Sequence, residues 1–162
     1  MDKKGNEVGN DKADKPKFRG RSIAKLDPKG RLRIPTKFKE ILQKHNIKTL
    51  VISRLGEYLV AYPPEEWDEV EAKALKLSQV HPEHRSFVRS FISGAEECDC
   101  DNQGRILIPP LLREDAHLDQ DVMFVGMLST LEIWNKSTYE LQKERDRQNE
   151  PKVMETIAIT GF

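Results

Sequence analysis

The chain has 162 residues, 37% of them hydrophobic and 33% charged, and its formal net charge at pH 7 is zero. This length predicts one domain or two small ones, and the longest apolar runs are far too short to span a bilayer. Residues 1–17 are charged throughout, which argues against a signal peptide and predicts a disordered N-terminal extension. We therefore expect a cytoplasmic protein that has no membrane partner.

The charges are distributed unevenly along the chain. Residues 1–54 hold 16 Lys and Arg against 6 Asp and Glu, a net of +10, whereas residues 55–162 hold 11 against 21, a net of −10. A basic half of this kind favours a phosphate backbone as a partner, with the acidic half facing elsewhere. Salt bridges between the halves would explain the same distribution, and charge alone does not choose between the two interpretations.

The first predicted elements are two short strands joined by a turn. Polar and apolar residues alternate over Ser22–Leu26 and again over Arg31–Ile34, which is the period of half-buried strands. Between them lies Asp27-Pro28-Lys29-Gly30. Asp in such a turn bonds forward to the backbone, Pro presets the next residue, and Gly takes the strained fourth position. These residues predict a hairpin.

Helices are predicted after the strands. Pro35 suits the first turn of a helix, in which Phe38, Ile41 and Leu42 would face a core. Acidic residues in a first turn and side-chain caps mark further helices along the chain. These helices open at Pro64, run from Pro82 to about Gly94, and run from a cap at Asn135 or Ser137 to about Arg147.

The chain contains the same unit twice. Asp27–Pro35 returns as Asp101–Pro109 at an offset of 74 residues, and Leu59–Tyr62 returns as Leu131–Trp134 at an offset of 72. A length change of two residues is tolerated best in a loop, which places it between these blocks. Each copy predicts a second strand pair: Leu50–Ser53 with Leu59–Tyr62, and Val122–Val125 with Leu131–Trp134.

This repeat predicts a tandem, β-rich α+β protein with flanking helices. Two repeats are too few for a solenoid, so we expect two compact modules. The predicted segments are an extension (1–17), a first module (18–67), a helical connector (68–94), a second module (95–139), and the end of the last helix with its tail (140–162).

The first turn is the candidate binding site. Seven basic residues lie between Phe18 and Phe38, against Asp27 alone. Arg reads guanine with two hydrogen bonds and Lys neutralises phosphate, so a basic hairpin predicts contact with DNA. The candidate DNA-binding residues are Lys25, Lys29, Arg31, Arg33 and Arg105, and the turn-shaping residues are Asp27, Gly30, Asp101 and Gly104. Alternatively, Arg31 and Arg105 pair with Asp27 and Asp101 and brace their own turns.

Other chemistry finds no support in the sequence. Cys98 and Cys100 are poorly placed for a disulfide and lack further zinc ligands at suitable spacing. Asp99–Gly104 begins like a calcium loop, but Pro110 stands where a bidentate Glu is required. Phosphate-binding and dinucleotide-binding glycine patterns are absent from the sequence. We therefore expect no metal, no cofactor, no small-molecule substrate and no enzymatic activity.

Several of these motifs resemble the MraZ family. The resemblance runs from about Phe18 to about Arg147, and two D-x-x-G-R turns in one chain are quite specific to it. The motifs are Phe18-Arg19-Gly20, Asp27 to Pro35, Tyr62-Pro63-Pro64-Glu65-Glu66-Trp67, Gly94-Ala95-Glu96-Glu97-Cys98, and Asp101 to Pro110. Residues 1–17 and the tail after Pro151 depart from the family's usual short form, so their roles stay open.

The resemblance implies a fold and a function. It implies two SpoVT-AbrB-type swapped-hairpin modules, each like a small double-psi barrel, that assemble into a ring-shaped homo-oligomer. It also implies a nucleoid-associated regulator, usually a repressor, that binds repeated DNA boxes upstream of the division and cell-wall gene cluster. The D-x-K-G-R turn is DNA-facing in the family, which here indicates Lys29 and Arg31, with Arg105 in the weaker copy.

A second interpretation is a protein–protein interaction module of the antitoxin type. AbrB-like hairpins also occur in antitoxins, where an attached tail binds a partner protein. The apolar segment Ile157-Ala158-Ile159 is a weak indication of such a tail.

Overall fold

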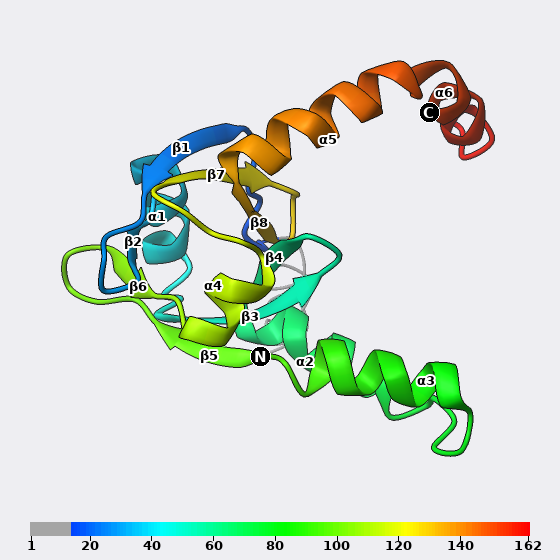
Figure 1. Cartoon of the computed structure of the whole chain (residues 1–162), viewed down its shortest axis with the longest axis horizontal. Helices are drawn as coiled ribbons and strands as arrows, with labels where there is room; N and C mark the ends of the chain where they lie inside the picture. The colour runs from blue at the N-terminus through cyan, green and yellow to red at the C-terminus, as the bar shows by residue number, and fades with distance from the viewer. Residues whose placement is uncertain (1–13) are drawn as a thin grey trace, which may run out of the picture.

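The computed structural model describes residues 14–162 and has an α+β fold, as the sequence predicts (Figure 1). In this part of the chain, six strands form one antiparallel sheet in the order β1-β7-β8-β4-β3-β5, and two more pair as β2-β6. The strands are β1 (Arg21–Lys25), β2 (Arg31–Arg33), β3 (Thr49–Leu55), β4 (Tyr58–Tyr62), β5 (Glu96–Asp99), β6 (Arg105–Leu107), β7 (Asp121–Gly126) and β8 (Leu131–Asn135).

Proline and asparagine mark where most of the helices begin. Proline occupies the first turn of α2, α3, α4 and α6, where its missing N–H costs nothing. The Asn135 side chain accepts hydrogen bonds from the N–H groups of Ser137 and Thr138 and so caps α5. The helices are α1 (Thr36–Lys44), α2 (Pro64–Ala74), α3 (Pro82–Phe87), a π-helical turn η2 (Val88–Ile92), α4 (Pro110–Asp115), α5 (Lys136–Gln148) and α6 (Glu150–Ala158).

Most of the strand pairings join the two repeats rather than forming within one copy. β1 pairs with β7, β2 with β6, β3 with β5 and β4 with β8, each antiparallel. The prediction that the first two strands, β1 and β2, pair with each other as a hairpin is therefore wrong. Leu26 and Leu32 form one isolated bridge beside the turn, after which the two strands diverge to partners in the second repeat. Only the second strand pairs, β3-β4 and β7-β8, form within one copy as predicted.

Both repeats contribute to one hydrophobic core. Phe38 and Leu42 of α1 are buried in it and Ile41 packs against it, as the helical spacing predicts. The buried Leu32 of β2 and Ile106 of β6 lie directly opposite each other in the ladder. Because one core is shared, removing either repeat would expose the apolar surface of the other.

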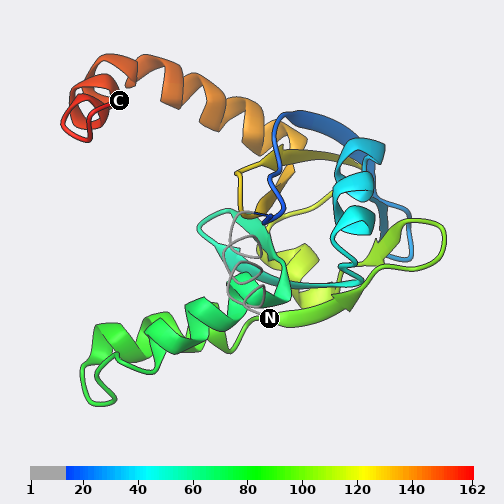
Figure 2. The same ribbon diagram turned by 180° about the vertical axis from the view of Figure 1, so that it is seen from behind.

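Helical segments extend from the sheets at two places. Figures 1 and 2 show α5 leading away from β8 to α6, and α3 projecting at a separate side of the molecule. The predicted helix from Pro82 is present, but its second half is the π-helical turn η2. The tail after Pro151, which the sequence left open, forms most of α6. Most of the predicted disordered extension, residues 1–17, lies outside the described residues.

Candidate nucleic-acid interface

The turn before β2 is held by a single carboxylate. Oδ1 of Asp27 accepts from the backbone N–H groups of Lys29 and Arg31, at 2.9 and 2.8 Å. Oδ2 of Asp27 accepts from Nε of Arg31 at 2.7 Å. These hydrogen bonds, chiefly that from the backbone of Arg31, hold the pKa of Asp27 below its ordinary value. The charged form of Asp27 is therefore the form that shapes the turn.

The second turn repeats this arrangement. Oδ1 of Asp101 accepts from the backbone N–H groups of Gln103 and Arg105, and its Oδ2 accepts from Nε of Arg105 at 2.9 Å. The backbone hydrogen bond from Arg105 is the main cause that lowers the pKa of Asp101. Arg31 and Arg105 thus do brace their own turns, as the alternative interpretation of the sequence proposes. Those contacts use Nε, and each guanidinium carries four further N–H donors on its Nη atoms.

The two turns are joined by the β2-β6 ribbon. Ile34 N–H donates to the carbonyl of Gly104, and Ile108 N–H donates to the carbonyl of Gly30, each at 2.9 Å. Each turn therefore lies against the end of the opposite strand, and the offset of 74 residues becomes an approximate two-fold relation in space. Leu32 and Ile106 fill the inner side of the ribbon. Its outer side, which we call the ribbon face, carries Arg31, Arg33, Arg105 and Leu107.

The structure brings some of the predicted cations together and separates others. Arg31, Arg33 and Arg105 share the ribbon face, and Nη1 of Arg33 donates to the carbonyl of Gln103 at 2.9 Å, linking β2 to the second turn. Lys29 lies at the tip of the first turn, and within residues 14–162 its side chain makes no hydrogen bond or ion pair. Lys25 lies on β1 instead, where its ammonium forms an ion pair with Asp121.

Two further basic residues flank the turns. A Cβ on Gly30 would meet Cζ of Arg113 at 2.6 Å, and a Cβ on Gly104 would meet Cδ of Lys39 at 2.8 Å. Lys39 and Arg113 are themselves 74 residues apart, so each is the repeat equivalent of the other. Neither residue is predicted from the sequence to be part of the site. The offset of 74 residues relates these two side chains in the sequence. Only the pairing of β2 with β6, however, places Lys39 and Arg113 each beside the turn of the other repeat.

The remaining candidates from the sequence form no reactive site. Cys98 is buried and Cys100 is half-buried, and burial raises the pKa values of their thiols to about 12 and about 11. Neither thiol is therefore an activated nucleophile at neutral pH. Within residues 14–162 no three His, Cys, Asp or Glu side chains gather as a metal site would require. No helix in the same range is both long and apolar enough to cross a bilayer.

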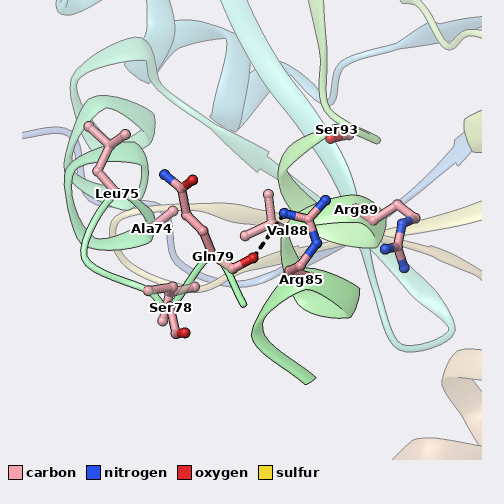
Figure 3. Close-up of a pocket in the computed structure, with 9 residues that line it drawn as sticks. Ala74, Leu75, Ser78, Gln79, Arg85, Val88, Arg89 and Ser93 are labelled. Carbon is pink, nitrogen blue, oxygen red and sulfur yellow. Dashed lines mark hydrogen bonds between the residues drawn. The ribbon is translucent and has the colours of Figure 1, made fainter. Parts of the chain in front are cut away.

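A hollow of about 340 Å³ lies between α2 and the α3-η2 segment (Figure 3). Ala74, Leu75 and Val88 line it together with Arg85 and Arg89. The Nη1 of Arg85 donates to the carbonyl of Gln79 at 3.0 Å, which closes the loop at one side of the hollow. Among the described residues no carboxylate lines this hollow, and Oγ of its Ser78 accepts hydrogen bonds from the N–H groups of Val80 and His81.

Comparison with known proteins identifies relatives that cover most of the chain. A family model described as "MraZ protein, putative antitoxin-like" matches twice, over residues 18–90 and 91–157. A protein of Syntrophobacter fumaroxidans, named transcriptional regulator MraZ, is 61% identical over 91% of this chain and 99% of its own length. Relatives of the same name from Desulfitobacterium hafniense and Shewanella denitrificans are 44% and 40% identical over 75% and 78% of this chain. These matches cover 83% and 85% of the relatives' own lengths.

Proposed function

The chain belongs to the MraZ family, and from that membership we propose that it is a sequence-specific, DNA-binding transcriptional regulator without enzymatic activity. The observation that carries this proposal is the ribbon face, on which three arginines lie side by side between two turns of identical hydrogen-bond pattern. The major groove of B-DNA is wide enough to admit a two-stranded ribbon of this kind. The names of the relatives support the same role.

In the proposed mechanism, Asp27 positions Arg31 before DNA arrives. A guanidinium fixed through Nε loses less conformational freedom on binding, which favours affinity. Its Nη atoms would donate to O6 and N7 of guanine, the most common specific contact in the major groove. Lys29 at the turn tip, with Lys39 and Arg113 beside the turns, would contact phosphates and set the register.

We also propose that the protein acts as a ring-shaped homo-oligomer on repeated boxes and represses by occluding a promoter, that of the division and cell-wall gene cluster. One ribbon offers few base contacts, so a single protein chain would bind weakly and lose affinity steeply with salt. Several ribbons on several spaced boxes raise affinity by about 10²–10⁴ through effective concentration. The exposed apolar residues of α6, Val153, Met154 and Ile157, are available for such self-association.

Footprinting of the protein on the DNA upstream of its own gene tests this proposal. We expect protected segments that recur at a regular spacing, together with a mass in solution that is a multiple of the 18.7 kDa chain. A reporter driven by the same DNA would show lower expression when the protein is present. A uniform or absent footprint would contradict sequence-specific binding, and a monomeric mass would contradict the ring.

An antitoxin-type interaction module is the second candidate, and α6 is the observation that favours it. Among the described helices and strands, α6 makes substantial contact only with α5. Its apolar side chains remain exposed. The segment Ile157–Ile159 lies at its end. Purification of the full chain with a stoichiometric protein of different sequence, and without a footprint on DNA, would favour this function over the first.

A further inference from the structure

The ribbon face contains one residue that does not fit a purely cationic surface. Leu107 lies directly opposite Arg31 in the β2-β6 ladder, and Arg105 lies opposite Arg33. Side chains opposite each other in an antiparallel pair stand about 5 Å apart on the same face. Leu107 is nevertheless 56% exposed, with buried neighbours on either side of it in the sequence, Ile106 and Ile108. It is therefore an apolar side chain within a group of guanidiniums and not part of the core.

The repeat makes this residue an exception to the two-fold relation. Leu107 is 74 residues after Arg33, so each ribbon strand contributes the D-x-x-G-R arginine, but only β2 contributes a second one. The turns, their carboxylates and the inward residues obey the repeat. The outward side of the ribbon thus has one half with two arginines and one half with an arginine and a leucine.

We infer that Leu107 is a specificity-determining residue that contacts the 5-methyl group of a thymine in the bound DNA. This inference rests on the proposed function. A surface that covers Arg31 and Arg33 must also cover Leu107, because these three side chains belong to one four-residue patch. The thymine methyl is the apolar group that a base pair presents in the major groove, and an apolar side chain is its usual contact. A guanine next to a thymine would then be read by an arginine and a leucine together.

A second copy of the same ribbon is a poorer occupant of this face. Two ribbon faces placed against each other would bring arginines into contact with arginines, and like charges in an interface oppose association. DNA satisfies both requirements at once, since its phosphates and guanines take the guanidiniums and its thymine methyl takes the leucine.

The test is a thymine-to-deoxyuridine scan, which removes one methyl group at a time from the protein's own upstream DNA. Binding of the full-length protein is measured by fluorescence anisotropy for wild type, Leu107→Ala and the matched control Leu55→Ala. Leu55 is an exposed leucine at the end of β3, outside the ribbon. We expect deoxyuridine at one position of each box to weaken wild-type binding about fourfold, the value for one buried methyl-sized group.

At that position, Leu107→Ala is expected to bind thymine and deoxyuridine equally, while Leu55→Ala behaves as wild type. If replacing thymine by deoxyuridine changes the affinity of wild type and Leu107→Ala equally at every position, while both still prefer the upstream DNA, the inference is overturned and the proposed function stands. If wild type shows no preference for the upstream DNA, the proposed function fails. A reduced oligomer mass in Leu107→Ala with an unchanged deoxyuridine pattern would assign Leu107 to a protein interface instead.

Discussion

Nε of Arg31 donates to Oδ2 of Asp27 at 2.7 Å, while the backbone N–H of the same arginine donates to Oδ1 at 2.8 Å. One carboxylate therefore closes the turn and fixes the direction of the guanidinium. In the sequence, bracing of the turn and contact with DNA are alternatives for this arginine. The geometry makes them compatible, because the ion pair with Asp27 uses Nε of Arg31 and leaves both Nη nitrogens available as donors.

Replacing Arg31 by lysine separates charge from geometry. Lysine keeps the positive charge that attracts phosphate but lacks the planar fork that reads guanine. We expect Arg31→Lys to lower affinity for the upstream DNA by about tenfold or more, the value of one bidentate contact, and to leave the salt dependence nearly unchanged. Arg54→Lys, on β3, is the matched control and should bind as wild type. Wild-type affinity of Arg31→Lys would show that Arg31 acts only as a charge.

Acid is expected to weaken the two turns. The pKa values of Asp27 and Asp101 lie below the ordinary 3.8, chiefly because backbone N–H groups donate to the charged carboxylates. Their stabilising contribution is therefore fully present above 3.8 and is lost as the pH falls through the lowered folded-state values. Urea unfolding at a series of pH values should show this loss in wild type and a flatter acid limb in the Asp27→Asn, Asp101→Asn double variant. An unchanged acid limb would contradict it.

Glu132 provides a control of opposite sign. Burial raises the pKa of this β8 carboxyl above its ordinary 4.5, although Nε1 of Trp134 donates to it at 2.8 Å. Its ionisation therefore destabilises the fold as the pH rises, whereas ionisation of Asp27 stabilises it. Glu132→Gln should increase the free energy of unfolding at neutral pH and leave the acid limb of the two aspartates in place.

A side chain at either turn glycine is expected to destabilise the protein. Gly30 and Gly104 have φ values of +88° and +73°, and a Cβ at each would collide with Arg113 or Lys39. We expect Gly30→Ala and Gly104→Ala to lower the free energy of unfolding by about 1–2 kcal/mol each, the cost of a left-handed alanine, and to weaken DNA binding as the flanking cations shift. Gly161→Ala is the control, since φ is +86° there but no atom lies within 4 Å. Equal effects of the three substitutions on DNA binding would show that the flanking cations do not matter.

The local features of this protein follow from its sequence, and its long-range pairing does not. The Asp27 turn, the buried face of α1 and the Asn135 cap depend on neighbouring residues, so residue type and spacing predict them. The partner of β1 is different, because Ser22 pairs with Phe124 about a hundred residues away. Any exposed strand edge with a matching apolar face would satisfy the local pattern equally. The family resemblance, rather than periodicity, indicated the swap.

The same reason explains what was missed in the candidate site. Lys39 and Arg113 are ordinary polar positions of amphipathic helices when each repeat is considered alone, and both are half-buried in the structure. They become part of the site only because β2 pairs with β6 and carries each turn to the helix of the other repeat. Leu107 is not among the site residues predicted from the sequence, since its exposure depends on the same pairing.

Dividing the chain within the connector tests the shared core. A break after Gln79 leaves β1 to β4 on one polypeptide and β5 to β8 on the other, and four of the strand pairings then join the two. We expect neither half to be a folded monomer, because each would expose the apolar face that the other covers. Co-expressed halves should co-purify in a 1:1 ratio and unfold cooperatively by circular dichroism. Cooperative unfolding of a monomeric half would contradict the interlocked fold.

We propose above that this protein recognises its own upstream DNA through the ribbon face. The most direct measurement is a titration of purified protein against that DNA and a scrambled control, at about 50 mM and about 200 mM salt. We expect tighter binding to the upstream DNA, weaker binding at the higher salt, and loss of the preference in Arg31→Ala with its fold and oligomer mass retained. Equal binding to both DNAs, or none to either, would contradict the claim.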